Sequence, residues 1–162
     1  MKKTPRGGRH RHERSVEIAT DGVRTPRGVG RLAGFCQKAL VDAGFDNWRV
    51  SILLCTDDRI TALNRRYRRR NEATDVLSFP EQEGRKGEPV AGDIALSLDA
   101  LRRNAAEFNV PENEEMKRLL VHGLLHLAGM DHGRGRGGRM LDLQERLLES
   151  LQSEKLYVGR GK

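Results

Sequence analysis

The chain has 162 residues, of which 33% are charged, and a formal net charge of +7; this length favours a single domain with its own core. A positive field of this size favours polyanionic partners, nucleic acid before anionic membrane. No apolar run approaches the roughly 20 residues of a membrane-spanning helix, and no apolar segment follows the charged N-terminus, so we expect neither membrane insertion nor a secretory signal. Cys36 and Cys55 lie far apart and outside any Cys-x-x-Cys pattern, which favours reduced thiols in a cytoplasmic protein.

Residues 1–14 are rich in Arg, Gly and His and lack hydrophobic periodicity, which predicts a disordered basic tail. The domain itself is expected over residues 15–157. Apolar alternation or short apolar runs predict strands at residues 15–20, 48–55, 75–79 and 91–97. Helical apolar stripes bounded by capping residues, Gly or Pro predict helices at residues 29–43, 57–67, 98–108, 111–128 and 140–151. With strands early and helices late, this order favours an α+β fold, in which helices pack on a single mixed sheet of about four strands.

Three of the five histidines lie within eleven residues, at His122, His126 and His132. A helix places residues i and i+4 on one face, so the first two imidazoles can reach one ion. Gly129 permits a left-handed residue that ends the helix and lets the chain bring His132 to the same ion. Three neutral nitrogens leave a tetrahedral Zn²⁺ one open position, which is typical of catalytic sites. The sequence therefore predicts one Zn²⁺ per chain in a zinc-hydrolase-like site.

The histidine spacing matches the metzincin protease motif H-E-x-x-H-x-x-G-x-x-H at every position but one. Gly123 stands where those proteases have the glutamate that serves as general base. Without this glutamate, peptide hydrolysis by that route lacks its proton acceptor, whereas the spacing of the metal ligands is unchanged. Asp131 is the nearest carboxylate, and it is a candidate for orienting a ligand or for proton transfer. A turn-stabilising role for Asp131 is an equally good interpretation.

Five arginines occupy the seven positions from Asn64 to Arg70, at the end of a predicted helix. Cations at the end of a helix complement the helix dipole, so one interpretation is that these arginines are simply a solvated helix end. Planar guanidinium groups also suit phosphate oxygens, and Tyr67 offers a ring for base stacking.

With these residues in view, the chain resembles the YbeY family of bacterial endoribonucleases and rRNA maturation factors. The resemblance is carried by four segments in the family's order, which are Asn64-x-x-Tyr67-Arg68, Thr74-Asp75-Val76-Leu77-Ser78-Phe79-Pro80, Gly92-Asp93-Ile94, and His122-Gly123-x-Leu125-His126-Leu127-x-Gly129-x-Asp131-His132. The last segment, with Gly in place of the protease Glu, is the most specific of them.

The resemblance implies an endoribonuclease specific for single-stranded RNA, active in maturation of the 16S rRNA 3′ end and in ribosome quality control. It implies single-stranded rRNA and the small ribosomal subunit as partners, without a small-molecule cofactor. Carried onto this sequence, the zinc ligands are His122, His126 and His132, and the phosphate-facing arginine is Arg68. Residues 74–80 would form a strand beside the cleft without a chemical role. Two features depart from the family: residues 133–139 are Gly and Arg where acidic residues are common, and the basic tail is additional.

The mechanistic hypothesis is that the metal activates water for attack on phosphorus while Arg68 stabilises the developing charge. A second hypothesis is a ribosome-assembly factor whose zinc is mainly structural and whose work is RNA binding, which the absent general base favours. A metalloprotease is the third hypothesis, and Gly123 disfavours it.

Overall fold

The computed structural model describes residues 13–131 and 137–156. The described elements, in chain order, are β1 (Arg14–Asp21), α1 (Val29–Asp42), β2 (Trp48–Cys55), α2 (Asp57–Arg68), β3 (Val76–Pro80), β4 (Val90–Ser97), α3 (Leu98–Glu107), α4 (Glu112–Leu127) and α5 (Gly137–Ser150). This is the predicted order, and each boundary lies within a few residues of its predicted place. Among the described helices, none is long and apolar enough to cross a membrane.

The four strands form one sheet in the order β1-β2-β4-β3. Strands β1, β2 and β4 run parallel, and β3 pairs antiparallel with β4 at the edge. The predicted α+β fold with a single mixed sheet is therefore confirmed. Because β3 is an edge strand, one of its sides remains open to form the wall of a cleft.

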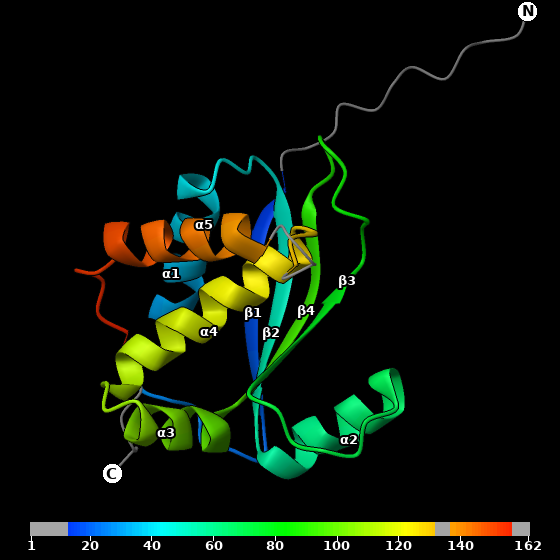
Figure 1. Cartoon of the computed structure of the whole chain (residues 1–162), viewed down its shortest axis with the longest axis vertical. Coiled ribbons are helices and arrows are strands. Elements are labelled where there is room, and N and C mark those ends of the chain that lie inside the picture. The colour runs from blue at the N-terminus through cyan, green and yellow to red at the C-terminus, as the bar shows by residue number, and fades with distance from the viewer. Residues whose placement is uncertain (1–12, 132–136, 157–162) are drawn as a thin grey trace, which may run out of the picture.

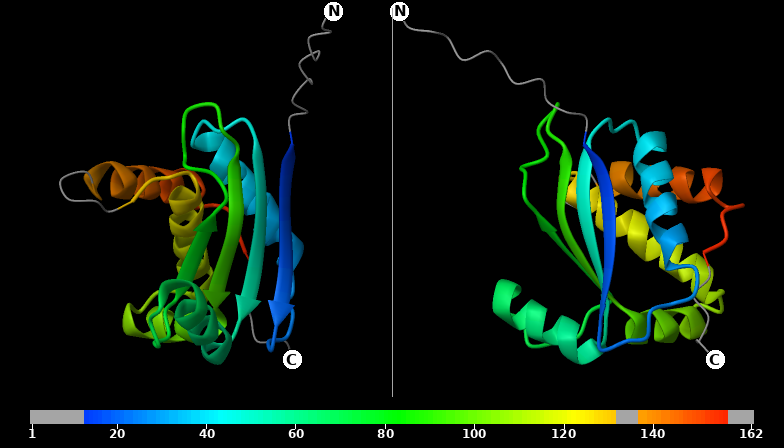
Figure 2. Two further views of the ribbon diagram at one scale, coloured as in Figure 1. Left: turned by 90° about the vertical axis from the view of Figure 1, so that its right-hand side faces the viewer. Right: turned by 180° about the vertical axis from the view of Figure 1, so that it is seen from behind.

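Helices α1, α4 and α5 lie on one side of the sheet, and α2 lies on the other (Figures 1 and 2). The main core lies between the sheet and helices α1, α4 and α5, where inward-facing residues of β2 and β4 meet the apolar side of α4. A smaller cluster joins α2 to the opposite face and contains Cys55, Ile60, Leu77 and Ala95. The sheet thus separates the helix that carries the histidines from the helix that carries the arginines, except at β3.

Local signals in the sequence explain where the helices begin. The Thr56 hydroxyl caps α2 by accepting the Arg59 N–H at 3.3 Å, and the Ser97 hydroxyl caps α3 by accepting the Ala100 N–H at 3.1 Å. Helix α4 begins after Pro111 with Glu112, Glu114 and Glu115 in its first turn, where carboxylates complement the helix dipole.

Two predicted details differ from the structure. Helix α5 begins at Gly137 rather than at the predicted residue 140, so the end of the Gly/Arg segment is helical; residues 133–136 lie outside the described part. Strand β3 includes Pro80, which is tolerated because an edge strand does not need the missing N–H for pairing. The predicted tail lies outside the described residues, apart from its last two positions.

Candidate metal centre

Helix α4 holds His122 and His126 on one face, as the i, i+4 spacing predicts. Their ring centroids are 4.5 Å apart, with the rings nearly perpendicular at 80°. The two Nε2 atoms face each other at 3.0 Å. The same ring nitrogen of both histidines is therefore directed to one point.

The other ring nitrogen of each histidine is held from outside. Nδ1 of His122 lies 2.9 Å from the side-chain oxygen of Gln144 on α5, and Nδ1 of His126 lies 2.9 Å from the main-chain carbonyl of Met130. Both oxygens are acceptors, so each Nδ1 carries the proton and donates it. The Nε2 atoms then carry the lone pairs that a metal ion requires.

The turn after α4 makes the Met130 carbonyl available. Gly129 has φ +87°, a backbone conformation that favours glycine. Its N–H bonds to the carbonyl of His126, and the Met130 N–H bonds to the carbonyl of Leu125, both at 3.0 Å. This is a Schellman ending, and it confirms the predicted left-handed stop at Gly129. The tight turn folds residue 130 back over the last turn of the helix, where its carbonyl meets His126.

The histidines line a cleft of about 420 Å³ whose other wall is β3 and the segment before it. Arg68, at the end of α2, lines the same cleft. Its guanidinium donates to the Ser78 carbonyl at 2.7 Å and lies 5.8 Å from the centre of the Phe79 ring. The structure therefore brings the predicted arginine and two predicted ligands to one cleft, although they come from opposite sides of the sheet.

Asp131 is exposed and also lines the cleft. The third predicted ligand, His132, lies outside the described residues. Within residues 13–131 and 137–156, no group of three or more His, Cys, Asp or Glu residues is arranged to hold a metal ion. The described geometry thus supplies two converging nitrogens, and the chain leads from Asp131 directly to the third histidine.

Gly123 lies where α4 presses on the sheet. A Cβ atom there would come within 3.1 Å of Ile94 Cδ1 and 3.4 Å of the Ser78 hydroxyl. The same hydroxyl donates to the Gly123 carbonyl at 3.0 Å. The Cβ atom of any side chain at this position would already contact the sheet, so glycine allows α4 to pack closely on β3 and β4.

Asp75, in the wall of the cleft, is one of several polar residues that sequence reasoning did not assign to the site. Its carboxylate accepts from the Asn104 amide at 3.1 Å and from the Val76 N–H at 2.8 Å. Asn104 also donates to the buried Glu115 at 3.1 Å. Arg118 donates to the same carboxylate, and this hydrogen bonding raises the pKa of Arg118. These contacts join α3 and α4 to the segment before β3 and fix that wall. In the sequence they give no signal, because Asn104 lies 29 residues from Asp75 and 11 residues from Glu115.

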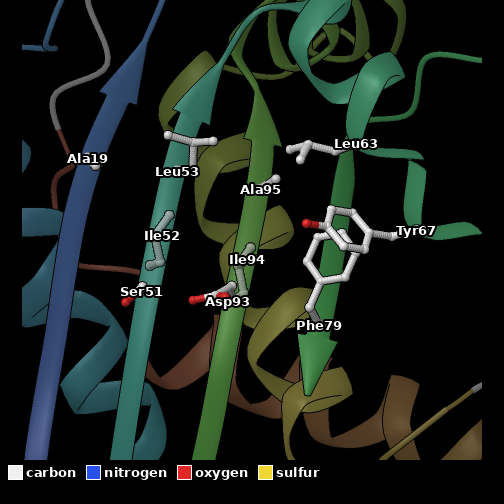
Figure 3. Close-up of a pocket in the computed structure, with 10 residues that line it drawn as sticks. All are labelled: Ala19, Ser51, Ile52, Leu53, Leu63, Tyr67, Phe79, Asp93, Ile94 and Ala95. Atoms are coloured by element: carbon white, nitrogen blue, oxygen red, sulfur yellow. The ribbon is translucent and has the colours of Figure 1, made fainter. Parts of the chain in front are cut away.

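Tyr67 does not share the cleft with the histidines. It packs edge-on against Phe79 with ring centroids 5.4 Å apart, and the Arg66 guanidinium lies 5.3 Å from its ring centre. Figure 3 shows both rings beside a second hollow of about 380 Å³, over the sheet face that α2 partly covers. Leu53, Ala95 and Asp93 line this hollow as well.

Comparison with known proteins agrees with these observations. A family model described as "Endoribonuclease YbeY" matches residues 30–152. The protein named endoribonuclease YbeY from Treponema denticola is 44% identical over 78% of this chain and 86% of its own length. The protein of that name from Aquifex aeolicus is 39% identical over 65% of this chain and 70% of its own. The solution structure of TM1509 from Thermotoga maritima superposes with a TM-score of 0.64, at 27% identity, covering 86% of this chain and 91% of that one.

The matched residues include most of α1 and every element from β2 to α5, and so Arg68, His122, His126 and His132. The family predicted from the four sequence segments is confirmed: this chain belongs to the endoribonuclease YbeY family.

Proposed function

We propose that the protein is a zinc-dependent endoribonuclease that cleaves single-stranded RNA, with one Zn²⁺ per chain held by His122, His126 and His132. The observation that carries the proposal is the pair of Nε2 atoms 3.0 Å apart in a cleft that Arg68 also lines. The family membership supports RNA as the substrate, and the two described histidines support the metal.

The donor set fits zinc on chemical grounds. With both Nδ1 atoms held by oxygens, the two Nε2 atoms are directed to one point and lie 3.0 Å apart, as two ligands of one cation do. Two nitrogens bound at about 2.0–2.1 Å to a tetrahedral ion would lie roughly 3.3 Å apart, close to the distance found. Neutral imidazole is a common ligand for zinc.

Bound zinc would supply Lewis-acid chemistry, polarising a phosphoryl oxygen and making water a better nucleophile. The chain's own contribution begins with Arg68, whose guanidinium has five N–H donors. One of its nitrogens donates to the Ser78 carbonyl, which orients the group along the cleft. The remaining donors are available to stabilise negative charge that develops on a phosphate. Asp131, on the rim, is our candidate for proton transfer.

The dimensions and charge of the cleft favour a single strand. A volume of about 420 Å³ is in the range of sites that take one small molecule. A single strand offers one splayed nucleotide without the energy of unpairing that a duplex requires. Exposed arginines at positions 65, 66, 69 and 70 are close to Arg68 in the sequence, and their positive charge favours the neighbouring phosphates of an RNA strand.

From the family resemblance we further propose that the substrate is 16S rRNA near its 3′ end, in the small ribosomal subunit, with a role in ribosome quality control. Such a substrate would place the protein in the cytoplasm.

The test combines metal analysis with cleavage of a labelled single-stranded RNA and the matching duplex. Wild type is expected to carry one zinc and to cut the single strand faster. His126→Ala is expected to lose zinc and activity, and Arg68→Ala to keep zinc and lose activity. Arg31→Ala, an exposed arginine on α1, is the matched control and should behave as wild type. If His126→Ala retained both zinc and nuclease activity, the proposal would be wrong; activity that does not follow the variants indicates a contaminating RNase.

The second candidate is an assembly factor in which zinc is structural and RNA binding is the essential work. The crowding around Gly123 favours it, because a Cβ atom there would already lie 3.1 Å from Ile94 and this position carries no catalytic carboxylate. The same crowding argues against a metalloprotease. A folded metal-site variant that binds RNA and supports rRNA maturation without cutting would select this candidate over the nuclease.

A further inference from the structure

Helix α5 contains one polar residue in its buried stripe. The stripe consists of Met140 and Leu147, continued by Leu151 in the turn after the helix, all at most 4% exposed, and of Gln144, which is 7% exposed. Gln144 and Leu147 follow Met140 by four and seven residues, so these three lie on one side of the helix. An apolar residue would complete this stripe, and burying an amide is unfavourable unless it is hydrogen-bonded.

The partner of this amide is a proposed zinc ligand. The Gln144 side-chain oxygen accepts from Nδ1–H of His122 at 2.9 Å. The bond links α5 to α4 across 22 residues of sequence. It keeps the proton on Nδ1 and turns Nε2 toward the cleft, where His126 Nε2 lies 3.0 Å away.

The two histidines are held in different ways. His126 donates to a main-chain carbonyl, that of Met130, which no side-chain substitution removes. His122 donates to a side chain that the sequence can change. Position 144 is therefore a place, among the described residues, where the sequence can tune the site without altering a ligand or the turn at Gly129.

We propose that Gln144 is a positioning residue for the metal centre and sets its affinity for Zn²⁺ through the orientation and tautomer of His122. This inference rests on the proposed zinc site. Outer partners of this kind change metal affinity about 10–100-fold when they are removed. A neutral amide is a weaker acceptor than a carboxylate, and its nitrogen side cannot accept. The chain thus has a partner of intermediate strength, between an apolar residue and a glutamate.

The experiment measures the zinc dissociation constant at pH 7.5 by competition with a chromophoric chelator, on the full chain. Gln144→Met keeps the length and shape of the side chain but lacks the oxygen, and we expect it to weaken zinc binding about 10–100-fold. Gln144→Glu restores a stronger acceptor and should bind at least as tightly as wild type. Leu147→Val, in the same buried stripe, is the packing control and should leave the dissociation constant within twofold of wild type.

A second measurement separates positioning from loss of fold. Imidazole ¹⁵N–¹H correlation spectra of the zinc-loaded protein report which nitrogen carries the proton; we expect Nδ1–H at His122 in wild type and its signal to shift or exchange in Gln144→Met. Melting temperatures of the metal-free proteins identify any variant that does not fold. Unchanged affinity in Gln144→Met, equal weakening in Leu147→Val, or a Gln144→Glu variant as weak as Gln144→Met would each overturn the inference. If wild type binds no zinc, the proposed function fails first and this inference fails with it.

Discussion

Replacing Gly92 by alanine is expected to destabilise the protein strongly, although the change adds one methyl group. Gly92 lies in β4 with φ +147°, a region that essentially only glycine adopts. A Cβ there would lie 2.3 Å from the Phe79 carbonyl oxygen and 2.9 Å from Leu127 Cδ2. The first of these atoms is backbone of the paired strand β3, so it cannot move without disturbing the β3–β4 ladder.

The magnitude follows from these two effects. The backbone conformation costs about 1–3 kcal/mol for a residue with a side chain, and forcing an extra carbon into close-packed surroundings adds about 1–3 kcal/mol. We therefore expect Gly92→Ala to lower the free energy of unfolding by about 2–6 kcal/mol, out of the roughly 5–15 kcal/mol typical of a domain. Because β3 is also the wall of the cleft, RNA cleavage should fall in the fraction that remains folded.

Gly34→Ala is the matched control. Gly34 lies inside α1, and a Cβ there would meet nothing within 4 Å. The same added methyl group should stabilise the protein by up to about 1 kcal/mol, because alanine has the higher helix propensity. Urea unfolding followed by circular dichroism measures both variants. The reasoning is refuted if Gly92→Ala unfolds within about 0.5 kcal/mol of wild type, a difference expected of an ordinary surface change.

Three further predictions concern charges and thiols. Arg68→Lys keeps a positive charge but loses the planar fork, so we expect kcat on single-stranded RNA to fall about tenfold with zinc content unchanged; wild-type kcat would contradict this. Burial raises the pKa of Cys36 to about 12 and that of Cys55 to about 11, so Ellman's reagent at pH 8 should react only after unfolding; rapid labelling of the folded protein would count against the core described here. The hydrogen bond from Arg103 lowers the pKa of Asp57 below its usual value, so its contribution to stability is present above about pH 4 and is lost as the pH falls further. Asp57→Asn should flatten the acid dependence of the Tm, and identical acid slopes for both proteins would argue against the pair.

Much of the fold was predictable because its signals are local. Alternation in β1, the apolar stripe of α1 and the Thr56 cap each act over a few residues, and each predicted element is present. The pairing of the strands was harder to predict from the sequence. That β4 lies between β2 and β3 depends on contacts between distant segments, and the sequence predicted only one mixed sheet of about four strands.

The candidate site likewise has one part that local spacing predicted and another that depends on the fold. The spacing of His122 and His126, and the glycine that ends α4, predicted two converging imidazoles, because a helix converts spacing into direction. Arg68 was assigned by resemblance, and only its contact with Ser78 of β3 in the folded chain places it at the cleft. Tyr67, its sequence neighbour, lies over the other hollow, because adjacent residues on a helix point about 100° apart.

The chain by itself determined its helices, its strands, its family and two of its proposed ligands, since these depend on short-range periodicity and motif spacing. The tertiary structure decided what surrounds them. It placed Gln144 of α5 behind His122, filled the space at Gly123 with Ile94 and Ser78, and joined Arg68 to the histidine cleft. These are contacts between elements, and their partners are selected by packing and hydrogen bonding in three dimensions rather than by distance along the chain.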